Sequence, residues 1–170
     1  EADFALRAAM ERTGGPTMLV LSRQVLPIFD LNKMTGEAEL YKGGYIISQE
    51  KGGVADIILM ASVSEVSLIV EVQETLAKEG IDARVVSMPC WELFLEQPQE
   101  YHDQVIPPEV KARLAVEAGV PQGWHQWVGD GGDIIGITTF GASAPASENF
   151  KQYGFTVENV VKRAKKLVGK

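Results

Sequence analysis

The chain has 170 residues, of which 45% are hydrophobic and 23% charged, and its 23 acidic residues outnumber 16 basic ones to give a net charge of −7. This composition is typical of one globular domain with a sizeable core, with room for part of a second domain. The basic residues are scattered apart from a cluster at Lys162–Lys166, so no broad basic face for binding nucleic acid is expected.

Single features exclude several other classes of protein. Cys90 is the one cysteine, so no internal disulfide can form, and its presence fits a reducing compartment and a cytoplasmic location. His102 and His125 are neither near Cys90 nor paired at a ligand spacing, so no metal site is predicted. No apolar run is long enough to cross a bilayer and no signal-peptide pattern is present, so no membrane partner is expected.

The first residues have the pattern expected in the middle of a domain. Asp3–Thr13 read as the end of an amphipathic helix that Gly14 and Gly15 stop. Four apolar residues, Met18–Leu21, then predict a buried strand. The strand that should precede such a helix in a βαβ unit is absent, so we expect the chain to open in the middle of a domain.

Three polar residues, Ser22, Arg23 and Gln24, follow at the carboxyl end of this predicted strand. Ligands of open α/β sheets bind just beyond the carboxyl ends of the strands. An arginine there presents a rigid charged fork that suits a phosphate or a carboxylate. The alternative is an arginine that caps an exposed sheet edge.

The next segment is interpreted as a linker, and a second α/β unit follows it. Residues 28–42 are polar and without period, as in a linker between domains. Tyr45–Ser48 predict a short strand that pairs as a hairpin with the strand Ala55–Ala61. Ser62–Glu65 match the S-x-x-E capping box at the start of a helix that ends at Gly80, and Ile81–Val86 resume as a strand. This order predicts a βαβ unit of a parallel sheet.

The remaining elements are shorter. Two further strands and four helices are expected, with a glycine- and tryptophan-rich loop at 119–133: strands at Ala112–Glu117 and Ile134–Thr138, and helices at Trp91–Glu96, Gln99–Val105, Ser147–Tyr153 and Val157–Val168. Thr156 is the predicted N-cap of the last helix.

Four groups of residues in this second unit are candidate chemical sites. The glycines of Gly129–Gly132 precede a strand pattern and lack the phosphate-loop spacing. Val63–Glu65 stand where a nucleotide phosphate would bind but lack the required glycines. The cluster Trp124–Trp127 surrounds a lone histidine with no nucleophile, and Cys90 reads as inert. From the residues alone, the second unit is a structural or binding module, and Arg23 is the one residue aimed at a ligand.

A series of motifs, in this order along the chain, resembles the transketolase family. They are L-S-R-Q-x-L-P at Leu21–Pro27, K-G-G-Y at Lys42–Tyr45, D-I-I-L at Asp56–Leu59, S-E-V-S-L at Ser64–Leu68, A-R-V-V-S-M-P at Ala83–Pro89 and F-G-A-S-A-P-A at Phe140–Ala146. The resemblance implies that residues 1–27 end a pyrimidine-binding domain, 28–42 form a linker and 43–170 form a C-terminal domain. That domain is expected to be a three-layer α/β domain with a mixed, mostly parallel sheet of about five strands.

The resemblance also implies a function for the parent protein. Transketolases are homodimers that depend on thiamine diphosphate and a divalent cation, Mg or Ca. They move a two-carbon ketol unit between sugar phosphates in the pentose phosphate pathway and the Calvin cycle. The arginine of L-S-R-Q binds the substrate phosphate in the family, so this role falls to Arg23. Catalytic, cofactor and metal residues would lie upstream, and this chain alone is expected to be inactive.

One departure and two alternatives remain open at this point. The turn that usually reads T-G-S-E or S-G-S-E in the family is S-V-S-E here, at Ser62–Glu65. The departure weakens the case for a small effector at this turn. The alternatives are a related thiamine enzyme, such as a 2-oxo acid dehydrogenase β-subunit or a deoxyxylulose phosphate synthase, and a free-standing binding or regulatory module.

Overall fold

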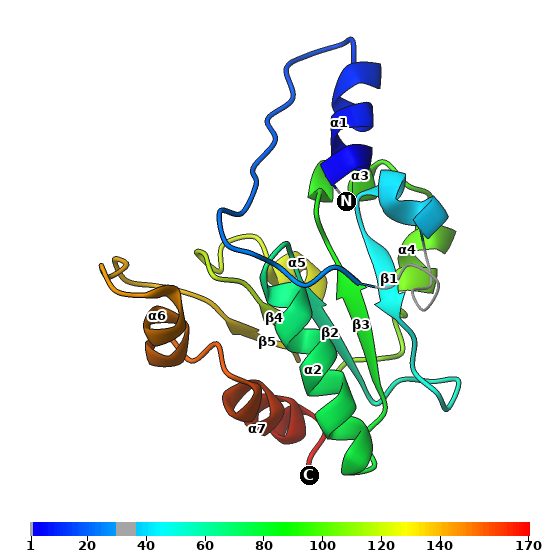
Figure 1. Cartoon of the computed structure of the whole chain (residues 1–170). Coiled ribbons are helices and arrows are strands. Elements are labelled where there is room, and N and C mark those ends of the chain that lie inside the picture. Colours follow the sequence, from blue (N-terminus) through cyan, green and yellow to red (C-terminus); the bar gives the residue numbers. More distant parts are fainter. Residues whose placement is uncertain (1, 30–36) are drawn as a thin grey trace.

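The computed structural model describes residues 2–29 and 37–170, and these residues form one five-stranded sheet in the order β1-β3-β2-β4-β5 (Figure 1). Its strands are β1 (Tyr45–Ser48), β2 (Ile57–Ala61), β3 (Ala83–Ser87), β4 (Arg113–Val116) and β5 (Asp133–Ile135). β2 to β5 pair in parallel, and β1 pairs with β3 in the antiparallel sense. The predicted mixed, mostly parallel sheet is confirmed.

The central strand β2 is apolar throughout because it is buried on both of its faces. Its side chains alternate between two hydrophobic cores, as the pleat of a strand requires. Ile57, Leu59 and Ala61 belong to one core, while Ile58 and Met60 belong to the other. The sheet therefore needs a layer of helices on each side.

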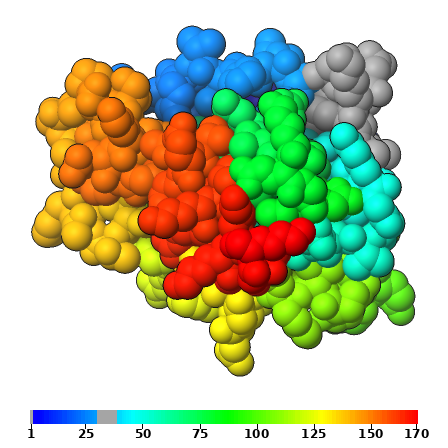
Figure 2. All heavy atoms as spheres, turned by 90° about the horizontal axis from the view of Figure 1, so that it is seen from below, coloured from blue at the N-terminus to red at the C-terminus, as the bar shows by residue number. Residues whose placement is uncertain are grey.

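Two sets of helices form these outer layers. α2 (Glu65–Lys78) and α7 (Val157–Leu167) pack on one face, where Figure 2 shows them side by side. α3 (Trp91–Leu95), α4 (Gln99–Val105) and α5 (His125–Val128) pack on the other. α6 (Ala146–Gln152) precedes α7. The predicted short helices and strands are confirmed to within two or three residues at each end. The predicted cap is confirmed as well: the Thr156 side chain accepts a hydrogen bond from the backbone N–H of Asn159 at 3.3 Å, at the start of α7. α5 lies inside the segment predicted as a loop.

The predicted hairpin between the first two strands of this sheet is wrong. β1 pairs with β3, because β3 and β4 occupy both edges of β2. The segment between β1 and β2 is held beside the start of β3 by Asp82. Its carboxylate accepts hydrogen bonds from the backbone N–H groups of Lys51, at 2.8 Å, and Gly52, at 2.5 Å.

The first residues lie apart from the sheet. α1 (Ala2–Glu11) stands beyond the end of the sheet toward which β3 runs (Figure 1). It contacts the short 3-10 helix η2 (Glu37–Lys42), where the rings of Phe4 and Tyr41 are 4.8 Å apart and Arg7 donates to the Tyr41 hydroxyl at 3.1 Å. Of the predicted linker, residues 30–36 lie outside the described residues.

The buried strand predicted at Met18–Leu21 is not formed in this structure. All four side chains are exposed, and the segment has no regular secondary structure. The reason is that no strand of the described residues lies beside it to accept and donate backbone hydrogen bonds.

Removing the side chain of Leu59 should destabilise the domain far more than removing an exposed one. Leu59 is 0% exposed in the middle of β2, so Leu59→Ala leaves a cavity and should lower the free energy of unfolding by about 2–5 kcal/mol. Val54, which is 66% exposed just before β2, is the matched control, and Val54→Ala should change it by less than about 0.5 kcal/mol. Urea unfolding of the two variants measures both changes, and similar losses in the two would contradict the two-core fold.

Candidate functional site

The carboxyl ends of β2, β3 and β4 meet at one edge of the sheet, which we call the carboxyl edge. The chain leaves β2 through α2 on one face of the sheet, whereas it leaves β4 through α5 on the other face. This divergence is a topological switch point, the place where open α/β sheets bind ligands. A hollow of about 320 Å³ opens there, lined by residues that directly follow each strand: Ser62, Met88 and Glu117, with Pro89, Cys90, Trp91, Glu92, Gly119, Val120, Gln122 and Trp124.

Two glutamates and two serines lie at the carboxyl edge, just after β2 and β4. The Ser62 hydroxyl donates to a carboxylate oxygen of Glu117 at 2.6 Å, and the Ser64 hydroxyl donates to Glu65 at 2.6 Å. Glu65 is only 2% exposed, although it starts α2. The predicted capping box is therefore wrong: the Ser62 hydroxyl is directed to Glu117, and the helix makes no side-chain cap hydrogen bond through its N-cap residue, Ser64.

Burial dominates the electrostatics of this pair of carboxyl groups. It raises the pKa of both Glu65 and Glu117, because removing a carboxylate from water disfavours its charged form. The hydroxyls of Ser64 and Ser62 partly offset the rise, and the nearby Glu65 raises the pKa of Glu117 further. A phosphate would meet two carboxyl groups here, which disfavours its binding at the start of α2.

The lining of the hollow also excludes nucleophilic chemistry of the usual kind. Among the described residues, Glu92 and Glu117 are its charged side chains, and no histidine, lysine or arginine lines it. Burial raises the pKa of the Cys90 thiol, which lowers its fraction of reactive thiolate. That Cys90 is inert stays a prediction.

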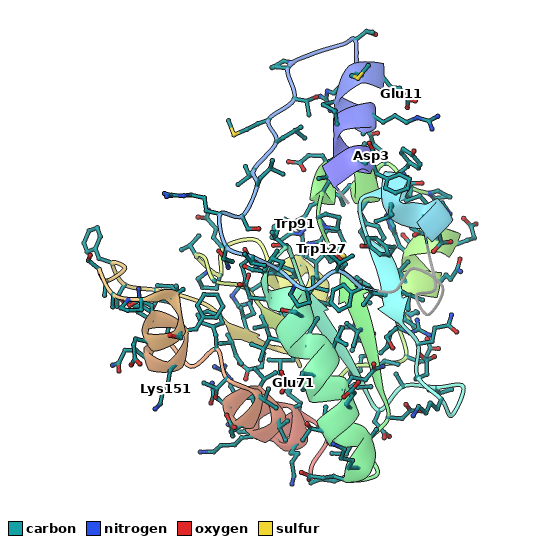
Figure 3. All side chains as sticks on the ribbon, in the orientation of Figure 1. Asp3, Glu11, Glu71, Trp91, Trp127 and Lys151 are labelled. Carbon is teal, nitrogen blue, oxygen red and sulfur yellow. The ribbon has the colours of Figure 1, made fainter. Side chains whose placement is uncertain are left out.

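The tryptophans predicted as a cluster do lie together, but as part of the core. The ring of Trp91 meets those of Trp124 and Trp127 edge to face, with centroids 5.0 and 6.1 Å apart, and Figure 3 shows Trp91 and Trp127 side by side. His125 between them in sequence is exposed.

A second hollow of about 220 Å³ lies between α4 and α5. Arg113 lines this hollow, and its guanidinium already donates hydrogen bonds to three backbone carbonyls, those of Pro107, Val110 and Trp127.

Arg23 is not part of either hollow. It is exposed in the segment that follows Met18–Leu21, and the described residues give it no hydrogen bond or ion pair. Its predicted role in phosphate binding therefore stays a prediction. Sequence reasoning missed the proximity of Glu65 to Glu117, although both follow predicted strands, because the sequence does not reveal that the two strands are neighbours.

No resident metal centre or membrane helix is formed by the described part of the chain. Within residues 2–29 and 37–170, no three His, Cys, Asp or Glu side chains are grouped to hold a metal ion. In the same residues, no helix has the length and apolar character needed to span a bilayer.

Replacing Glu65 by glutamine should change how stability depends on pH. The folded pKa of Glu65 lies above its ordinary value of 4.5, so the stability it contributes is present below that value and is lost as pH rises through the folded pKa. Glu65→Gln should remove this loss, so the difference in unfolding free energy between variant and wild type should shift in favour of the variant as pH rises. Urea unfolding from about pH 4 to about pH 8 measures it.

The exposed Glu96 supplies the control for this measurement, since Glu96→Gln removes a carboxyl group that faces water. Its difference from wild type should be nearly flat over the same range. Equal slopes for the two variants would contradict the buried position of Glu65.

Comparison with known proteins agrees with this fold. A family model described as the transketolase-like TK C-terminal domain matches residues 43–156. The chain is 47% identical to the transketolase of Geobacillus stearothermophilus over 170 residues, and 46% identical to that of Bacillus subtilis (strain 168) over 170 residues, covering the whole chain but only 25% and 26% of those proteins. A crystal structure of Pichia stipitis transketolase in complex with sedoheptulose-7-phosphate superposes with a TM-score of 0.88 at 38% identity, over 98% of this chain and 23% of that one. The chain thus spans about a quarter of the length of its relatives, and it belongs to the transketolase family, in the region of that family's C-terminal domain.

Proposed function

We propose that this chain is the C-terminal portion of a transketolase that transfers a two-carbon ketol unit from a ketose phosphate to an aldose phosphate. The observation that carries the proposal is 47% identity to a transketolase along the entire chain. A matching family model of transketolase type favours this activity over that of a 2-oxo acid dehydrogenase β-subunit or a deoxyxylulose phosphate synthase. Relatives about four times longer argue against a free-standing module.

In the proposed domain arrangement, residues 1–27 end a pyrimidine-binding domain, 28–42 link it to the next, and 43–170 form the C-terminal domain. The exposed apolar run Met18–Leu21 supports the first part, because a contiguous run of exposed apolar side chains marks a surface that other polypeptide covers. Its backbone has no sheet partner among the described residues, which suits a strand of a sheet built mostly by upstream residues. The start of the family match at residue 43 supports the last boundary.

Arg23 is proposed to bind the phosphate of the sugar. Its position within the L-S-R-Q motif supports this role, as does a guanidinium that is exposed and has no counter-ion among the described residues. A guanidinium fork suits a phosphate because it donates two parallel, charge-assisted hydrogen bonds.

Thiamine diphosphate and its divalent cation are proposed to bind to residues outside this chain. The side chains present here do not fit them. The described residues hold no group of metal ligands, and the hollow at the carboxyl edge places Glu92 and Glu117 where a diphosphate would be repelled. The chain alone is therefore proposed to be inactive, and the full-length protein to act as a cytoplasmic homodimer on sugar phosphates.

Loss of the Arg23 guanidinium in the full-length enzyme should weaken binding of phosphorylated sugars. Arg23→Ala is expected to raise KM for xylulose 5-phosphate by about tenfold or more and to lower kcat less, because the phosphate is bound in both the ground state and the transition state. Arg23→Lys keeps the charge but not the planar fork, so its KM should lie between those of the wild type and Arg23→Ala.

Unphosphorylated xylulose is the control substrate, because its KM should be the same in all three proteins. Arg12→Ala removes another exposed arginine from the same part of the chain and should leave both KM values unchanged. An unchanged KM for xylulose 5-phosphate in Arg23→Ala would remove Arg23 from the site.

The reaction class has its own test. The full-length protein should convert xylulose 5-phosphate and ribose 5-phosphate to products in the presence of thiamine diphosphate and magnesium, and should not consume pyruvate. Turnover of pyruvate in place of the ketose phosphate would assign the protein to one of the related thiamine enzymes.

A further inference from the structure

The second hollow, of about 220 Å³, lies between α4 and α5, beside the first residue of β4. Phe94 and Ile106 give it an apolar wall, and Arg113 and Trp127 line it as well. We propose that this hollow binds a small organic carboxylate, with its apolar body against the wall and its charged end toward the other two side chains. The proposal goes beyond the proposed function, because neither Arg23 nor the residues of the carboxyl edge line this hollow.

The indole of Trp127 is a buried donor that lacks an acceptor. Trp127 is only 8% exposed, and its Nε1–H has no hydrogen-bond partner among the residues that the structure describes. A buried polar group without a partner lowers stability, and native proteins satisfy nearly all such groups. Since Trp127 lines the hollow, an oxygen atom of a molecule held there can provide the acceptor.

Arg113 brings a positive charge without a counter-ion. A guanidinium has five N–H groups, and three of those of Arg113 donate to backbone carbonyls at 2.8 to 3.0 Å, so two remain free to donate. No carboxylate of the described residues forms an ion pair with it. Burial lowers the pKa of Arg113, and the exposed Glu109 offsets only part of this effect.

A carboxylate meets both requirements at once. It accepts hydrogen bonds from neutral and charged donors, and its bond to a guanidinium is charge-assisted. A water molecule would satisfy the indole N–H of Trp127 but would leave the charge of Arg113 uncompensated. The hollow therefore suits an anion better than it suits water alone.

The remaining polar groups of the hollow limit which anion fits. His102 donates from Nε2 to the carbonyl oxygen of Phe94 at 2.6 Å, and Gln99 donates to Asp103 at 2.8 Å, so these side chains are already engaged. The carboxylate of Asp103 repels a dianion such as phosphate more than it repels a single negative charge. Pockets for drug-sized ligands hold roughly 300–1,000 Å³. The smaller hollow suits a monocarboxylate about the size of benzoate.

Benzoate is the probe for this site, used with the full-length protein. Equilibrium dialysis should show saturable binding with a Kd on the order of 1 mM, and benzamide, which has the same shape without the charge, should bind about tenfold more weakly. Trp127→Phe removes the N–H and keeps an aromatic ring, so it should weaken benzoate binding about tenfold. Arg23→Ala should leave the Kd unchanged, because Arg23 does not line the hollow. Absence of saturation, equal affinities for benzoate and benzamide, an unchanged Kd in Trp127→Phe or weaker binding in Arg23→Ala would each overturn the proposal.

Asp103→Asn provides a test of opposite sign that does not depend on the packing of Trp127. Asp103 is exposed, so its substitution should leave the fold intact, and loss of its negative charge should tighten benzoate binding about twofold to fivefold. Glu148→Gln is the matched control, since it removes an exposed negative charge on α6 that does not line the hollow, and its Kd should equal that of the wild type. An Asp103→Asn protein that binds benzoate no more tightly than Glu148→Gln does would refute the site.

Discussion

The parallel pairing of β2 with both of its neighbours is the interaction on which the rest of the domain depends. Every residue of Ile57–Ala61 is removed from water, and its backbone groups are bonded to β3 on one side and β4 on the other. A strand of this kind divides the interior into two cores that share no side chain. Each core then requires its own layer of helices, so α2 and α7 lie on one face and α3, α4 and α5 on the other.

The same pairing determines what is found at the carboxyl edge. Parallel neighbours place the residues that follow β2 and β4 side by side, although Ser62 and Glu117 are 55 positions apart in sequence. The edge that would bind an anionic ligand in a nucleotide-binding sheet is filled here by carboxyl groups of the chain itself. The carboxyl group of Glu65 lies at the start of α2, where such a ligand would bind, and Glu117 is held by Ser62 beside it. The domain thus shares the architecture of ligand-binding sheets but carries carboxyl groups where their ligands bind.

The N-terminal segment behaves differently from the domain, and the contrast bears on function. Met18–Leu21 have the composition of a buried strand, yet they are exposed because no strand of the described residues lies beside them. Arg23 follows directly, and a substrate site at that point would have to be completed by other polypeptide. The chain covers about a quarter of the length of its relatives, and the phosphate-binding role of Arg23 stays a proposal.

Local sequence signals determined the elements of this protein. The apolar run of β2, the 3.6-residue pattern of α2 and the Thr156 cap of α7 depend on neighbouring residues alone, so their positions were predictable. The order of the strands was not, because hydrogen bonding between β1 and β3 joins residues about 40 positions apart, and no local pattern specifies such a pairing. The meeting of Glu65 with Glu117, the loss of the predicted capping box and the exposure of Met18–Leu21 were also decided by tertiary structure. Each depends on which distant segment lies alongside, and the free energy that selects it comes from the packing of the whole domain.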